Sequence, residues 1–131
     1  MTDSSDKATV LATNQSFYEA FSQGDISSMS GLWWQGSTSL CVHPGGRVIV
    51  GWDKIRASWE SIFNNTDSLE IDLEVIKIDV DRSLAYVVVR EIVLQSSRGR
   101  KFKAESIATN IFQKMAQKWY LVSHHGSPIV R

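Results

Sequence analysis

Histidines are the side chains of this 131-residue sequence best suited to proton transfer near neutral pH, and there are three of them. His43 stands directly before Pro44-Gly45-Gly46, at an expected tight turn between two short strands. An imidazole at the mouth of a pocket can serve as a general base, so His43 is a candidate catalytic residue. Alternatively, it is a turn residue whose ring hydrogen-bonds the backbone of the following glycines.

The other two histidines, His124 and His125, are adjacent on the expected last strand. Neighbouring residues on a strand point to opposite faces, so only one of them can face a pocket. His125 shares its face with Trp119 and Leu121, and we take it as a candidate ligand-binding residue. His124 would then lie with Tyr120 on the other face or at the rim.

Two further polar residues interrupt apolar strands. The amide of Asn110 can donate a hydrogen bond to a ligand carbonyl, which makes it a second candidate catalytic residue, or it satisfies a bulged strand. The carboxylate of Glu91 lies on an apolar face, where a raised pKa would suit an acid or base. The alternative for Glu91 is a cross-strand ion pair with Lys101 or Lys103.

Aromatic residues are concentrated around His43, with four of the five tryptophans between residues 33 and 59. Large rings either line a ligand cavity or fill a core. The candidate ligand-binding aromatic residues are Phe17, Tyr18, Trp34, Trp52 and Trp59.

Composition narrows the classes of partner. Lys and Arg number 14, as do Asp and Glu, so no net field attracts nucleic acid or an anionic membrane. The single cysteine, Cys41, allows no internal disulfide, and the histidines and Cys41 form no dense set of metal ligands. With no apolar run near the ~18 residues of a membrane span and no apolar leader, we expect a cytoplasmic protein that needs no metal or cofactor.

The hydrophobic pattern predicts one α+β domain over residues 1–131, with a disordered tail at residues 1–6. Helices are expected at 6–22, 26–33 and 54–64, with a short hairpin between the second and third. Four long strands follow, at 69–80, 84–94, 102–114 and 118–125. A change of phase between Val75 and Ile76 predicts a β-bulge that bends the sheet.

Both faces of the 84–94 strand are largely apolar, although an antiparallel sheet with one wet face would alternate. One face therefore covers the helices and a cavity. The other is expected to meet a second copy of the chain, which gives a homodimer through the sheet.

Short motifs in a characteristic order carry a family resemblance. They are Phe17-Tyr18-x-Ala20-Phe21-x-x-Gly24-Asp25, His43-Pro44-Gly45-Gly46, Gly51-Trp52-x-x-Ile55, Trp59, Asn110-Ile111-Phe112 and Trp119-x-x-Val122-x-His124-His125-x-Ser127-Pro128. Over residues 7–128 the sequence resembles the SnoaL-like branch of the nuclear transport factor 2-like (NTF2-like) superfamily. The resemblance implies a cone-shaped barrel, with three N-terminal helices packed on a strongly bent antiparallel sheet, a deep pocket and a dimer.

The ketosteroid isomerases of that superfamily provide a comparison of site positions. By motif, the position of their aspartate base falls on His43, that of their helix tyrosine on Phe17, and that of their late-strand aspartate on Asn110. Steroid isomerisation is therefore not implied for this chain.

Two functions follow as expectations. The first is an isomerase or lyase that acts on a small hydrophobic carbonyl compound, with His43 moving the proton and Asn110 or His125 stabilising the oxyanion. The alternative is a non-catalytic ligand-binding or assembly module that uses the sheet face. The retained polar residues favour the first function, and the changed acid–base positions favour the second.

Overall fold

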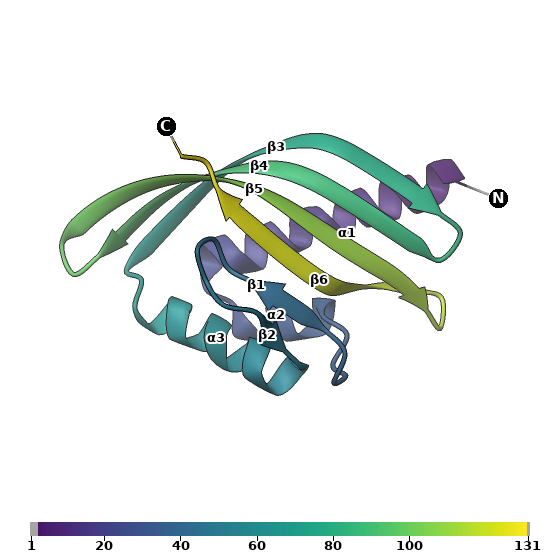
Figure 1. Cartoon of the computed structure of the whole chain (residues 1–131), viewed down its shortest axis with the longest axis horizontal. Helices are drawn as coiled ribbons and strands as arrows, with labels where there is room; N and C mark the ends of the chain where they lie inside the picture. Colours follow the sequence, from purple (N-terminus) through teal and green to yellow (C-terminus); the bar gives the residue numbers. More distant parts are fainter. Residues whose placement is uncertain (1–2, 131) are drawn as a thin grey trace.

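The computed structural model describes residues 3–130, with side chains from residue 5 onwards. Three helices and one six-stranded sheet make up these residues (Figure 1). The elements are α1 (Asp3–Gln23), α2 (Ile26–Leu32), β1 (Leu40–Val42), β2 (Ile49–Val50), α3 (Trp52–Asn64), β3 (Ser68–Asp81), β4 (Leu84–Ser97), β5 (Arg100–Met115) and β6 (Lys118–Pro128). No helix among the described residues has the length and apolar composition that a membrane crossing requires.

The sheet has the strand order β2-β1-β6-β5-β4-β3 and arches over α1, as Figure 1 shows. The predicted α+β architecture is therefore confirmed. One pairing differs from the expected all-antiparallel sheet, because β1 runs parallel to β6 and places Val42 opposite His125. His43 follows β1 directly, so this pairing brings it beside the end of β6.

The bend of the sheet comes from β3. Its register with β4 shifts between Val75 and Lys77, which confirms the bulge predicted from the change of phase. The curved inner face then wraps around aromatic residues of α1 and α3. Buried residues of this core include Phe17, Trp33, Trp59, Phe112 and Leu121.

The start of α1 differs from the sequence prediction. The helix begins at Asp3, so residues 3–6 are helical instead of part of a disordered tail. The carboxylate of Asp6 accepts hydrogen bonds from Lys114 Nζ at 3.2 Å and Trp119 Nε1 at 3.3 Å, which attaches this turn to the sheet. Residues 1–2 of the predicted tail lie outside the described residues.

A second bulge, in β6, was not predicted. Ile111 of β5 lies opposite Ser123, but its neighbour Phe112 lies opposite Leu121, so Val122 is an extra residue. The extra residue reverses the alternation of side chains beyond it. His124 consequently joins Leu121 on the inner face, and His125 is exposed.

Close packing between β6 and the turn after β1 gives a first prediction. A Cβ added at Gly126 would lie 2.8 Å from Cγ of Pro44, whose ring cannot move aside without moving the turn that holds His43. We expect Gly126→Ala to lower the free energy of unfolding by about 1–3 kcal/mol, measured by urea denaturation.

The matched control is Gly31→Ala in α2, where an added Cβ meets nothing within 4 Å. This change should raise stability by up to about 1 kcal/mol, because alanine favours the helix. Equal effects of the two substitutions would contradict the packing between Gly126 and Pro44.

Candidate functional site

Five polar side chains form a continuous hydrogen-bonded network inside the cone. Tyr18 of α1 donates from its hydroxyl to Glu91 Oε2 on β4 at 2.5 Å. Asn110 of β5 donates from Nδ2 to the Tyr18 hydroxyl at 3.1 Å and to Asn14 Oδ1 at 2.9 Å. Its Oδ1 lies 2.6 Å from Nδ1 of His124 on β6. All five are buried, so this set is called the buried polar network below.

The direction of these hydrogen bonds follows from the Glu91 carboxylate. A distance of 2.5 Å is typical of a hydroxyl that donates to an ionised carboxylate. Having donated its hydrogen, the Tyr18 oxygen must accept from Asn110, which fixes the orientation of that amide. The Asn110 oxygen can only accept, so His124 carries its hydrogen on Nδ1 and its lone pair on Nε2.

The network borders a pocket of about 370 Å³ between α3 and the strands β4, β5 and β6. Glu91 and His124 lie at its deep end, where they are 2% and 1% exposed. His43 reaches the same pocket from the turn after β1. Its other lining residues are Phe21, Pro44, Ser61, Ile62, Asn65, Thr66, Val93, Gln95, Ala104 and Ser106.

Burial shifts the acid–base properties of the three titratable groups in this pocket. Desolvation raises the pKa of Glu91, and the hydrogen bond from Tyr18 offsets part of that rise. Desolvation lowers the pKa of His43. The two pKa values therefore move toward each other. Burial also lowers the pKa of His124 to about 3, so this imidazole stays neutral at physiological pH.

Cys41 lies close to the site without being activated by it. Its sulfur is 3.7 Å from His43 Nε2. Burial, with a smaller effect of the Glu91 charge, raises the pKa of the thiol to about 12. Cys41 therefore remains a protonated thiol and not a nucleophile.

Some of the predicted site residues lie in or beside this pocket, and others lie away from it. His43 and Glu91 line the pocket. Tyr18 does not line it but donates a hydrogen bond to Glu91. No lysine among the described residues forms an ion pair with Glu91, which instead accepts a hydrogen bond from Tyr18. Asn110 is absent from the lining, and its amide is occupied by three neighbours. It therefore positions other groups and is not available to a ligand.

Three of the predicted aromatic ligand-binding residues lie outside the lining of this pocket. Trp34 is 38% exposed and packs on Tyr120, with ring centroids 5.6 Å apart. Trp52 packs on the core residue Trp33, away from the pocket. Trp59 packs against His43, with ring centroids 4.7 Å apart, and is not among the residues that line the pocket.

Phe17 supports the site from below instead of lining it, since its ring lies 5.1 Å from that of His124. His125, also predicted as a ligand-binding residue, lies outside the lining of this pocket. The bulge at Val122 turns His125 to the outside and His124 to the pocket.

Two residues of the network, Asn14 and His124, were missed. Asn14 stands four residues before Tyr18 on α1, a spacing that puts both on one helix face. That spacing was a usable signal. For His124 the sequence held no comparable signal. Apolar and polar residues do not alternate regularly along β6, so the extra residue causes no recognisable change of phase.

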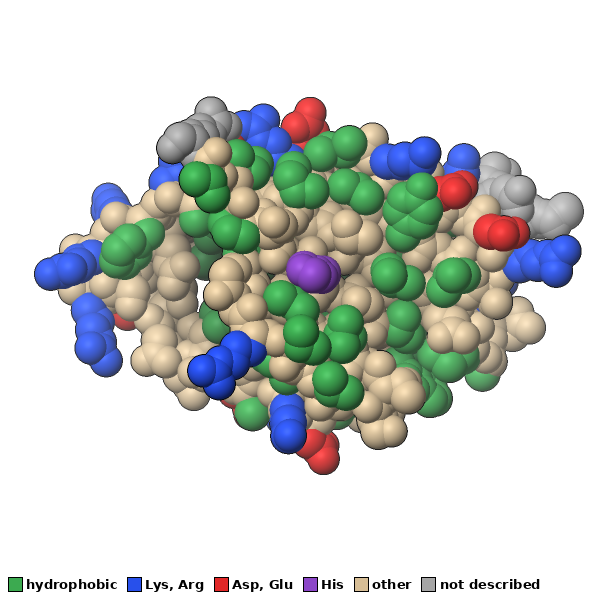
Figure 2. Space-filling model, viewed as in Figure 1, with side chains coloured by type: hydrophobic (Ala, Val, Ile, Leu, Met, Phe, Trp, Pro, Cys, Tyr) green, Lys and Arg blue, Asp and Glu red, His purple; other side chains and the backbone are tan. Residues whose placement is uncertain are grey.

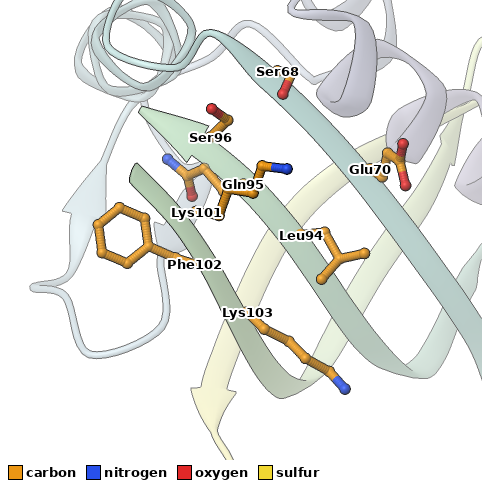
Figure 3. Close-up of a pocket in the computed structure, with 8 residues that line it drawn as sticks. All are labelled: Ser68, Glu70, Leu94, Gln95, Ser96, Lys101, Phe102 and Lys103. Atoms are coloured by element: carbon orange, nitrogen blue, oxygen red, sulfur yellow. The ribbon is translucent and has the colours of Figure 1, made fainter. Parts of the chain in front are cut away.

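A second pocket, of about 340 Å³, lies near the β4–β5 hairpin, and its lining side chains come from three neighbouring strands (Figure 3). It is lined by Ser68, Glu70, Leu94, Gln95, Ser96, Lys101, Phe102 and Lys103. None of these residues is buried. It therefore lacks the desolvated acid–base groups that distinguish the first pocket.

Among the described residues, no three side chains of His, Cys, Asp or Glu are arranged to ligate one ion. The titratable groups that line the pocket are one carboxylate and two imidazoles.

Residues 10–131 match the family model of the SnoaL-like domain, and the chain belongs to that family. A provisionally assigned dehydratase of the NTF2-like family from Streptomyces avermitilis is 31% identical, with a TM-score of 0.92 over 99% of this chain and 100% of that one. A provisionally assigned association domain of calcium/calmodulin-dependent protein kinase type II from Thiobacillus denitrificans is 23% identical, with a TM-score of 0.84. It covers 93% of this chain and 96% of that chain, and shows the fold alone.

A curated relative, the F-box protein SKIP8 of Arabidopsis thaliana, is 21% identical over 118 residues. The match covers 90% of this chain and 48% of that protein, so the chain spans about half the length of this relative.

The lowered pKa of His124 predicts a loss of stability in acid. An imidazole in the unfolded chain titrates at about 6.5, so between that value and about 3 the unfolded state binds more protons than the folded state. Stability therefore falls as the pH drops through this range, by up to about 1.4 kcal/mol per pH unit. His124→Gln cannot titrate, and its unfolding free energy should fall less between about pH 6.5 and about pH 5.

Urea denaturation at several pH values measures these slopes, and His125→Gln is the matched control because that side chain lies outside the network. The control should keep most of the native slope. Parallel pH profiles for native protein and His124→Gln would show that His124 is not held neutral by the fold.

Proposed function

We propose that this protein is a lyase that removes water from a small β-hydroxy carbonyl compound bound in the pocket. The observation that carries the proposal is the convergence of Glu91, His43 and His124 on one pocket of about 370 Å³, a size suited to a small organic molecule. The similarity to the provisionally assigned dehydratase supports the same reaction class.

The proposed base is Glu91. Its carboxylate takes the proton on the carbon next to the carbonyl, and the electrons of that C–H bond form a carbon–carbon double bond. The bond from the β-carbon to the hydroxyl then breaks, and the hydroxyl leaves as water with the proton that Glu91 returns. The raised pKa of Glu91 favours this transfer, because its carboxylate is a stronger base than that of an exposed glutamate.

The imidazoles and the network have supporting roles in this proposal. His43 is the second proton acceptor of the pocket and hydrogen-bonds the substrate at its rim. Tyr18 and Asn110 hold Glu91 and His124 in place and do not contact the substrate. Asn110 is therefore proposed as a positioning residue, and the oxyanion role expected for it is not retained.

The β-hydroxy ketone formed from benzaldehyde and acetone is a suitable probe, because its dehydration gives a conjugated enone that is followed by ultraviolet absorbance. We expect the native protein to accelerate dehydration and Glu91→Gln to lower that rate by about 100-fold or more, since the amide cannot accept the proton.

Glu74→Gln is the matched control, because this carboxylate is exposed on β3 and should leave the rate unchanged. Equal rates for the native protein and Glu91→Gln would remove Glu91 as the base. Binding of the probe with no acceleration would instead favour the alternative of a ligand-binding protein.

The outer face of the sheet supports a second proposal, the assembly of two copies. Val88 and Ile92 of β4 alternate with Val87 and Val89, which belong to the core on the helix side. They therefore lie on the opposite face, where they are only half-buried. On the face that Figure 2 shows, hydrophobic side chains gather in the middle and charged ones lie mainly at the periphery. A two-fold dimer through the sheet would bury the apolar outer face.

Val88→Glu tests this assembly by placing a charge on the outer face. We expect the native protein to sediment as a dimer and Val88→Glu to shift toward the monomer, since a buried unpaired charge is costly. Val48→Glu is the control, because Val48 is exposed in the segment between β1 and β2. A native protein that is monomeric at every concentration would contradict the dimer.

A further inference from the structure

The hydroxyl of Ser106 is a buried polar group of the pocket that the rest of the protein does not use. Ser106 lies on β5, is 4% exposed and lines the pocket. No described residue forms a hydrogen bond with its side chain. A buried hydroxyl without a partner is costly, and native structures rarely keep one. The cost is recovered if the partner is a molecule bound in the pocket.

The Ser106 oxygen is accessible from the pocket. Among the described residues, the side-chain polar atoms that are both fully enclosed and without a hydrogen bond are the indole nitrogens of Trp33 and Trp59. The Ser106 oxygen has no partner but is not enclosed in this way, and the space that it borders is the pocket. Its hydrogen is therefore available to a ligand.

Ser106 lies directly opposite Glu91, the proposed base. The antiparallel strands β4 and β5 pair these two residues, and both side chains are on the inner face of the sheet. The Cβ atoms of residues paired in this way are about 4.5–5.5 Å apart. A molecule in the pocket can therefore contact the carboxylate of Glu91 and the hydroxyl of Ser106 at the same time.

Other donors around the carboxylate are committed to protein acceptors. Within the buried polar network, Tyr18 donates to Glu91, the Asn110 amide uses both of its hydrogens, and His124 donates from Nδ1. His43 donates from Nε2 to Ser58 at 3.0 Å, because the Ser58 hydrogen is used by a backbone carbonyl of α3. These groups hold one another in place and leave the serine of β5 to serve the ligand.

We propose that Ser106 is a catalytic residue, which donates a hydrogen bond to the carbonyl oxygen of the substrate while Glu91 removes the proton from the neighbouring carbon. This inference rests on the proposed function and supplies the donor that its reaction calls for. The carbon that loses the proton is bonded to the carbonyl carbon, so a base and a donor on paired residues suit the two reacting positions.

The proposed step places negative charge next to Ser106. When Glu91 takes the proton, the electrons of the C–H bond form a double bond to the carbonyl carbon, and the carbonyl π electrons move to the oxygen. The hydrogen bond from Ser106 strengthens as this charge develops. The electrons then return, the double bond moves to the β-carbon, and the hydroxyl leaves as water with the proton from Glu91.

Ser106→Ala removes the hydroxyl and adds nothing. With the hydroxy ketone formed from benzaldehyde and acetone, we expect kcat to fall about 100-fold and KM to change by less than about threefold, because the donor acts mainly on the transition state. Ser106→Thr keeps a hydroxyl and should be at least about tenfold faster than Ser106→Ala. Ser127→Ala is the matched control, since Ser127 is exposed on β6 outside the pocket lining and should keep the native rate.

Two measurements separate catalysis from a structural role of Ser106. Ser106→Ala should unfold at the same urea concentration as the native protein, because no hydrogen bond within the protein is lost. The pKa of Glu91, followed by carbon NMR, should also stay unchanged. A rise of that pKa in Ser106→Ala would show that the hydroxyl serves the carboxylate, and would overturn the inference.

Benzylacetone, labelled at its carbonyl carbon, tests the hydrogen bond without the reaction, because it has no hydroxyl to lose. Bound to native protein, its carbonyl resonance should move downfield, and Ser106→Ala should reduce that shift. Equal shifts and equal rates in the two proteins would overturn the inference and leave the lyase in place. A shift that depends on Ser106 without any dehydration would overturn the proposed function and keep Ser106 as the donor to a bound carbonyl. Failure of benzylacetone and the hydroxy ketone to bind would overturn both.

Discussion

The hydrogen bond from Tyr18 to Glu91 is the interaction on which the rest of the site depends. A carboxylate that is 2% exposed is costly to keep ionised, and the Tyr18 hydroxyl at 2.5 Å compensates part of that cost. Its direction then determines every later hydrogen bond, through Asn110 to His124. One buried charge therefore sets both the proton affinity of the pocket and the tautomer of its deepest imidazole.

Two irregularities of the sheet bring the polar side chains of the site close together. The bulge in β3 bends the sheet over α1, so that the helix residue Tyr18 reaches Glu91 on β4. The bulge at Val122 in β6 turns His124 inward, and the parallel pairing of β1 with β6 brings His43 alongside, with the two imidazole rings 6.4 Å apart. Irregular strand geometry, more than any loop, assembles the site.

The sequence predicted the fold well because the periodic spacing of apolar residues determines the helices and strands. The helices, the hairpin and the bulge near Val75 all follow from the spacing of apolar residues. The site was predicted in part. Glu91 was identifiable as a polar residue on an apolar face, whereas the choice between His124 and His125 depended on one extra residue in β6. Trp34 and Trp52 show the other limit, since aromatic rings near a site in sequence often pack elsewhere in space.

Carbon NMR titration of the Glu91 carboxyl group tests the central claim most directly, in native protein and in Tyr18→Phe. The account predicts a pKa above the ordinary glutamate value of about 4.3, because burial penalises the charged form. It also predicts a further rise in Tyr18→Phe, since the phenol hydrogen bond favours ionisation. A Glu91 that titrates like an exposed glutamate, and does so unchanged in Tyr18→Phe, would contradict the account.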